Sequence, residues 1–182
     1  MNNKKTAIIL VLVLALLIGG ASILYTLLGK DRAHDQLAGQ GDGTQQNQAA
    51  DFVVYDAEGN PVRLSDYFGK PIVLNFWASW CGPCQMEMPD FQKKYLELGD
   101  EVIFLMVNVT GYDSQAAAMG FIQSQGYTFP VFYDLTLDAV NTYGVRGFPV
   151  TYFIDAGGRV VTYANTALDA ATLQRGIDLI TG

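Results

Sequence analysis

The sequence contains only two cysteines and one histidine among its 182 residues, and this scarcity excludes several kinds of protein. A small domain held together by disulfides needs several cysteine pairs spread along the chain, whereas Cys81 and Cys84 belong to one motif. A structural zinc site needs four ligands, and His34 lies far from both cysteines in a polar stretch. We therefore predict no metal site and no bound cofactor, and expect the cysteine pair to act through its own chemistry.

Positive charge is also scarce, with 11 Lys and Arg against 18 Asp and Glu and a formal net charge of -7. Residues 51–182 alone carry 7 basic and 15 acidic side chains. Nucleic-acid binding needs clustered Lys and Arg to neutralise phosphates, and no basic stripe is present. We predict no nucleic-acid partner.

One long hydrophobic run extends over residues 7–28, and Lys4 and Lys5 precede it. About twenty apolar residues, each rising ~1.5 Å, span a hydrocarbon core of ~30 Å, whereas a cleaved signal peptide has a hydrophobic stretch of only ~7–15 residues. We interpret 7–28 as a transmembrane signal anchor; a cleaved signal peptide and a buried core helix are the alternatives. The basic residues place 1–6 in the cytoplasm. The prediction is a single-pass protein of the bacterial cell membrane with an extracytoplasmic C-terminal domain.

Residues 29–50 are polar and rich in Gly and Gln, with too little apolar surface to offset the entropy of ordering them. We interpret them as a flexible linker, which leaves 51–182 as the folded domain.

Within this domain, hydrophobic periodicity and turn residues predict strands alternating with helices. The strands are expected over 52–55, 62–64, 71–77, 102–109, 129–133, 149–154 and 159–163, and the helices over 81–98, 114–125, 135–143 and 168–180. The runs 71–77 and 102–109 are almost continuously apolar, which is typical of strands buried on both faces. The pattern predicts an α/β fold with a central mixed β-sheet flanked by helices.

The segment Trp80-Cys81-Gly82-Pro83-Cys84 joins a predicted buried strand to a predicted helix. At a helix N-terminus, free backbone N–H groups and the helix dipole favour a thiolate over a thiol at Cys81. Cys84 lies one turn later, so its sulfur can reach back and resolve a mixed disulfide. Gly82 and Pro83 suit a first helical turn, in which a missing N–H costs nothing. We therefore predict a redox-active disulfide between the two cysteines.

This segment resembles the thioredoxin motif, and Asn75-Phe76-Trp77-Ala78-Ser79 leads into it as in that superfamily. The fuller resemblance, over about 52–180, is to membrane-anchored thiol–disulfide oxidoreductases of the TlpA/ResA type. It implies a thioredoxin-like fold over 51–182 with an N-terminal β-hairpin and a central insertion.

The resemblance also implies roles for particular residues. Glu87, three residues after Cys84, matches an acidic residue near the active site that relays a proton or opposes thiol ionisation. Pro149 matches a cis proline that faces the cysteines and keeps metal ions from them, and the Phe148 backbone is expected to pair with an extended substrate segment. Trp80 is expected at a partly exposed rim beside the thiols, and Trp77 in the core.

At two places the sequence differs from thioredoxin or from the ResA-type proteins. Asn75 stands where thioredoxin has a buried aspartate, and because an amide takes no proton at neutral pH, acid–base help must come from Glu87. Gly82 and Pro83 match thioredoxin and differ from the Glu-Pro pair of the ResA-type proteins, which leaves the reduction potential open.

The resulting hypothesis is a protein-disulfide reductase in which Cys81 attacks a disulfide of another extracytoplasmic protein and Cys84 displaces the product thiol. The resemblance implies apocytochrome c as one substrate, which would link the chain to cytochrome c biogenesis. It also implies a CcdA- or DsbD-like membrane thiol carrier as the electron donor. A disulfide-donating oxidase, a peroxidase and a copper or other metal chaperone on the same fold are the alternatives.

Overall fold

The computed structural model describes Leu12, Val13, Leu16, Gly19, Gly20, Leu37 and residues 47–182. The chain divides into two compact units, Met1–Asp35 and Gln36–Gly182. Within the described residues, no helix has both the length and the apolar character needed to cross a membrane. The cytoplasmic segment predicted over 1–6 lies outside these residues, as do most of the anchor predicted over 7–28 and most of the linker predicted over 29–50.

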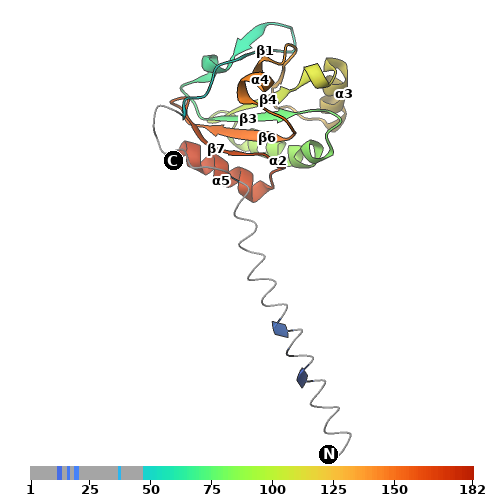
Figure 1. Cartoon of the computed structure of the whole chain (residues 1–182), viewed down its shortest axis with the longest axis vertical. Helices are drawn as coiled ribbons and strands as arrows, with labels where there is room; N and C mark the ends of the chain where they lie inside the picture. Colours follow the sequence, from blue (N-terminus) through green and yellow to red (C-terminus); the bar gives the residue numbers. More distant parts are fainter. Residues whose placement is uncertain (1–11, 14–15, 17–18, 21–36, 38–46) are drawn as a thin grey trace, which may run out of the picture. The chain divides into compact units, whose positions relative to one another are not determined.

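The second unit is built on a seven-stranded mixed sheet with the strand order β2-β1-β5-β4-β3-β6-β7 (Figure 1). The strands are β1 (Val53–Tyr55), β2 (Pro61–Arg63), β3 (Ile72–Trp77), β4 (Ile103–Asn108), β5 (Val131–Tyr133), β6 (Val150–Ile154) and β7 (Val160–Ala164). β3, β4 and β5 run parallel to one another, while β1–β2, β1–β5, β3–β6 and β6–β7 are antiparallel pairs. This arrangement confirms the predicted fold class and the opening hairpin.

β3 lies inside the sheet, between β4 and β6, and both of its faces are covered. All six of its side chains are buried, and the five apolar ones are divided between two hydrophobic clusters. Val73 and Trp77 join one cluster, while Leu74 and Phe76 join the other. A strand covered on both faces reads as a continuous apolar run, which is why 71–77 was recognisable in the sequence.

Helices cover the two faces unequally. The helices α2 (Gly82–Leu98), α3 (Gln115–Gln125) and α5 (Ala170–Thr181) contribute to the cluster that contains Trp77, and the short α4 (Asp138–Tyr143) contributes to the other. α5 approaches β6 closely through Gly176, since a Cβ there would lie 2.2 Å from the Phe153 ring. The segment with α3 and β5, between β4 and β6, is the central insertion that the resemblance implies.

The start of the folded unit differs from the predicted boundary at residue 51. Gln48 forms a β-bridge with Arg159, and the Ala49 N–H donates to the Gly158 carbonyl at 2.8 Å. Ala49 is itself buried. These contacts are made to the β6–β7 turn, far along the chain, so local composition could not reveal them.

Candidate active site

Cys81 and Cys84 form a disulfide at the junction between β3 and α2. Cys81 is the N-cap residue of α2, and its sulfur accepts a hydrogen bond of 3.2 Å from the Cys84 N–H. Gly82 and Pro83 form the first, exposed turn of the helix. The strand-to-helix placement predicted for the pair is therefore present, and a helix N-terminus stabilises negative charge on the Cys81 sulfur.

The two sulfur-bearing residues differ in their access to solvent. Cys84 is fully buried, whereas Cys81 is 5% exposed. The preceding Trp80 is 61% exposed, and its indole Nε1 donates to the Tyr112 carbonyl at 3.0 Å. Trp77 is completely buried, so the predicted division into a core and a rim tryptophan is confirmed.

Glu87 lies one turn after Cys84 on α2, and its side chain is buried rather than solvated. Its Oε1 accepts a hydrogen bond of 2.9 Å from Asn75 Nδ2, and its Oε2 accepts one of 2.9 Å from the Leu168 N–H. Asn75 Nδ2 also donates to Thr151 Oγ1 at 2.9 Å. A single carboxyl group thus joins α2 to β3 and to the segment that precedes α5, and through Asn75 it is connected to β6.

Burial raises the pKa of Glu87 to about 7, although the hydrogen bonds from Leu168 and Asn75 act in the opposite direction. Desolvation disfavours the charged carboxylate more than two donors favour it. A carboxyl with this pKa exchanges its proton close to neutral pH, as a thiol reaction at neutral pH requires.

The peptide bond between Phe148 and Pro149 is cis, as the resemblance implies. The Phe148 ring contacts the Trp80 ring edge-to-face, with centroids 6.1 Å apart. Phe148 also packs against both hydrophobic clusters, including the one that contains the two cysteines. The sequence-predicted residues at 80–84 and 148–149 are therefore brought together at one end of the sheet.

Asp113 is a part of the site that the sequence did not reveal. Its carboxylate accepts hydrogen bonds from the Ser79 N–H at 2.6 Å, the Ser79 hydroxyl at 2.8 Å and Asn108 Nδ2 at 2.9 Å. It also accepts one from the Ser114 N–H at 2.8 Å. Partial burial acts to raise the pKa of Asp113, but these hydrogen bonds outweigh it and the pKa lies below its ordinary value. Asp113 thereby fixes the position of Ser79 in the loop that leads to Trp80 and Cys81.

In the part of the chain that the structure describes, no three His, Cys, Asp or Glu side chains are grouped so that they could hold a metal ion. His34, considered in the sequence as a ligand, lies outside those residues. The chemistry that the described site supports is that of its two sulfur atoms and one buried carboxyl group.

Comparison with known proteins agrees with this chemistry. The sequence model of the AhpC/TSA family matches residues 46–163. The chain is 34% identical over 163 residues to thiol-disulfide oxidoreductase ResA of Bacillus thuringiensis (strain Al Hakam), an alignment that covers 87% of each chain.

Solved structures show the same fold. One, described as the thiol:disulfide interchange protein DsbE of Chlorobium tepidum, is 29% identical with a TM-score of 0.68, covering 79% of this chain and 99% of its own. StoA of Bacillus subtilis is 26% identical with a TM-score of 0.62, covering 72% of this chain and 98% of its own.

The buried carboxyl predicts a pH-dependent stability that Glu87→Gln should abolish. The folded pKa of about 7 lies above the ordinary 4.5, so the unfolded chain releases this proton first and stability is lost as the pH rises through 7. Between pH 5 and pH 8 the wild-type free energy of unfolding should fall by about 2 kcal/mol relative to the variant, as measured by urea denaturation.

Glu97→Gln is the matched control, because Glu97 lies on the same helix but is exposed and forms a surface ion pair with Lys94. Its stability should follow the wild-type pH dependence. Parallel pH curves for the wild type and Glu87→Gln would contradict a perturbed Glu87.

Asp113→Ala should destabilise the protein by about 2–3 kcal/mol, because part-buried donors on Ser79 and Asn108 lose their acceptor. Asp56→Ala removes a carboxylate of similar hydrogen bonding from an exposed turn, where Asn60 is its partner, and should destabilise the protein clearly less than Asp113→Ala does. Urea denaturation measures both. Equal losses in the two variants would show that Asp113 is no more than an exposed turn residue.

Proposed function

Since the chain belongs to the AhpC/TSA family and is a thiol–disulfide oxidoreductase of the ResA and DsbE type, we propose that it reduces disulfides in extracytoplasmic proteins. The observation that carries this proposal is the Cys81–Cys84 disulfide at the N-terminus of α2, with Cys84 buried and Cys81 at the surface side. Cys81, which is 5% exposed, meets the substrate first, and the fully buried Cys84 completes the exchange.

The reaction begins with the dithiol form. The Cys81 thiolate attacks one sulfur of the substrate disulfide, so that a Cys81–substrate disulfide forms and the other substrate sulfur leaves as a thiolate that takes a proton. The Cys84 thiolate then attacks the Cys81 sulfur, and the second substrate sulfur leaves. Two electrons pass to the substrate, and the Cys81–Cys84 disulfide remains.

Glu87 supports the second step. Cys84 must lose its proton before it can attack, and it has no access to solvent. Glu87 lies one helical turn away with a pKa of about 7, which suits it to take that proton at neutral pH. Asn75 has no ionisable group and acts by holding the Glu87 carboxyl through its hydrogen bond.

The oxidised protein must then receive two electrons from a dithiol donor. A CcdA- or DsbD-like membrane thiol carrier fits this need, and the hydrophobic run over 7–28 would hold the domain beside it as an N-terminal anchor. Apocytochrome c, with its haem-site cysteines, is the substrate that the likeness to ResA-type proteins favours.

The reduction potential of the Cys81–Cys84 pair tests the direction of transfer. The Gly-Pro pair between the cysteines is that of thioredoxin, so we expect a potential at or below about −220 mV, in the range of glutaredoxins and thioredoxin. Equilibration of the protein in dithiothreitol and glutathione buffers measures it. A potential near about −120 mV would contradict the reductase and identify a disulfide donor.

Glu87→Gln should lower the rate of disulfide reduction at pH 7.5 by about tenfold or more, since Gln accepts no proton. The rate of the wild type should rise through an inflection near pH 7 that the variant lacks, and stopped-flow measurement of thiol release follows both. Glu97→Gln should keep the wild-type profile. An unchanged profile in Glu87→Gln would show that Cys84 loses its proton by another path.

A further inference from the structure

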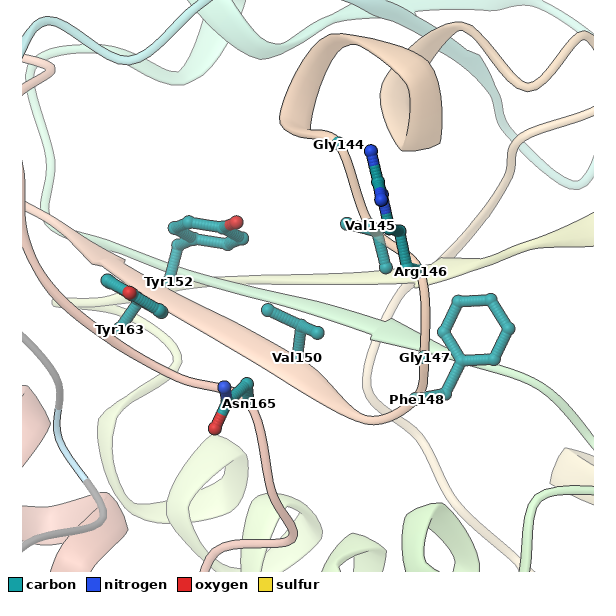
Figure 2. Close-up of a pocket in the computed structure, with 9 residues that line it drawn as sticks. All are labelled: Gly144, Val145, Arg146, Gly147, Phe148, Val150, Tyr152, Tyr163 and Asn165. Atoms are coloured by element: carbon teal, nitrogen blue, oxygen red, sulfur yellow. The ribbon is translucent and has the colours of Figure 1, made fainter.

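A groove of about 380 Å³ extends from Phe148 over residues of β6 and β7, and neither cysteine lines it. Figure 2 shows the Phe148 ring at one end, the Tyr152 and Tyr163 rings at the other, and Val150 between them. The wall opposite β7 is the loop that contains Gly144, Val145, Arg146 and Gly147. Apart from Phe148, whose backbone is expected to pair with a substrate segment, none of these groups has a part in the thiol chemistry described above.

The groove is continuous with the reactive end of the molecule through Phe148. This ring lines the groove and also contacts the Trp80 ring, which directly precedes Cys81. Under the proposed function, a substrate segment whose cysteine is joined to Cys81 passes Phe148. Its neighbouring residues then lie over the groove.

The groove has one charged residue, and that charge is positive. Arg146 is exposed and joins neither of the ion pairs found among the described residues, which involve Arg63 and Lys94. No carboxylate lines the groove, although residues 51–182 carry 15 acidic and 7 basic side chains. A lone guanidinium is thus placed where the rest of the domain repels anions, and its planar fork matches a carboxylate.

The far end of the groove suits an apolar or aromatic side chain. Tyr152 and Tyr163 stack with centroids 5.6 Å apart and an interplanar angle of 24°. Together with Val150 they form a flat platform, and the Asn165 amide lies on the same side.

We propose that this groove selects protein disulfides whose cysteine is flanked, within about three residues, by an acidic side chain that pairs with Arg146. The inference rests on the proposed function and deepens it, because it names the class of substrate. A protein segment is the occupant, since a groove that extends from the disulfide past two tyrosines accommodates several consecutive residues.

Six-residue peptides provide the test. Each contains one cysteine joined to 2-thiopyridine, a neutral leaving group, with Glu, Gln or Lys at the second or third residue on either side. The reduced full-length protein is mixed with each peptide, and thiopyridone release gives the second-order rate constant. At one or more positions the Glu peptide should react about three- to tenfold faster than the Gln peptide, and the Lys peptide more slowly still. This ratio should fall at high salt.

Arg146→Ala should bring the Glu-to-Gln ratio close to one. Arg159→Ala is the matched control. Arg159 is exposed, as Arg146 is, but it lies on the β6–β7 hairpin and does not line the groove, so the Glu-to-Gln ratio of this variant should equal that of the wild type. Since each ratio compares two substrates on one variant, a general effect on thiol reactivity cancels.

Equal rates on all peptides, or a preference for Glu that survives in Arg146→Ala, would overturn the inference and leave the proposed function intact. The inference would also be overturned if all peptides reacted at equal rates while glutathione disulfide reacted faster than the peptides in an Arg146-dependent way. That result would assign the groove to a small thiol compound. Failure to cleave any peptide would overturn the proposed function itself.

Discussion

The buried hydrogen bond from Asn75 to Glu87 is the interaction on which the geometry of the active site depends. A carboxyl group without access to water is costly unless donors surround it, and this one finds them on β3 and at Leu168. Because Glu87 lies one turn after Cys84, the donors that hold the carboxyl also fix the first turn of α2. The position of the Cys84 sulfur is therefore constrained by residues that are distant in the sequence.

The same constraint explains why an amide suits position 75. Asn75 uses both hydrogens of its Nδ2, for Glu87 and for Thr151 Oγ1, and its Oδ1 is buried with no hydrogen-bond partner among the described residues. An aspartate there would set a second carboxylate against Glu87 and raise one of the two pKa values further.

The sequence predicted those features that depend on local pattern. The apolar run at 71–77, the helix that follows it and the cysteine pair at their junction all appear where they were expected. Asp113 was missed because its partner Ser79 is 34 residues away, and only the parallel pairing of β3 with β4 brings them together. The donor at Leu168, 81 residues from Glu87, is a backbone group that no side-chain pattern marks. Composition and periodicity do not show which strands pair or in which register, and these contacts depend on that pairing.

The side chains of β6 alternate between two faces of the sheet, one with the hydrogen bonds around Glu87 and the other with the groove. Thr151 stands opposite Asn75 in the β3–β6 register and faces the buried carboxyl network, while Val150 and Tyr152 face the groove. Successive side chains of a strand point to opposite faces, so Thr151 and the hydrogen bonds around Glu87 lie on the other side of the sheet from Val150 and Tyr152, which line the groove. Phe148, which packs on both clusters, is the point where the two meet. If the groove binds substrate as proposed, substitutions on that face of β6 can change substrate preference while the hydrogen bonds around Glu87 on the other face stay as they are.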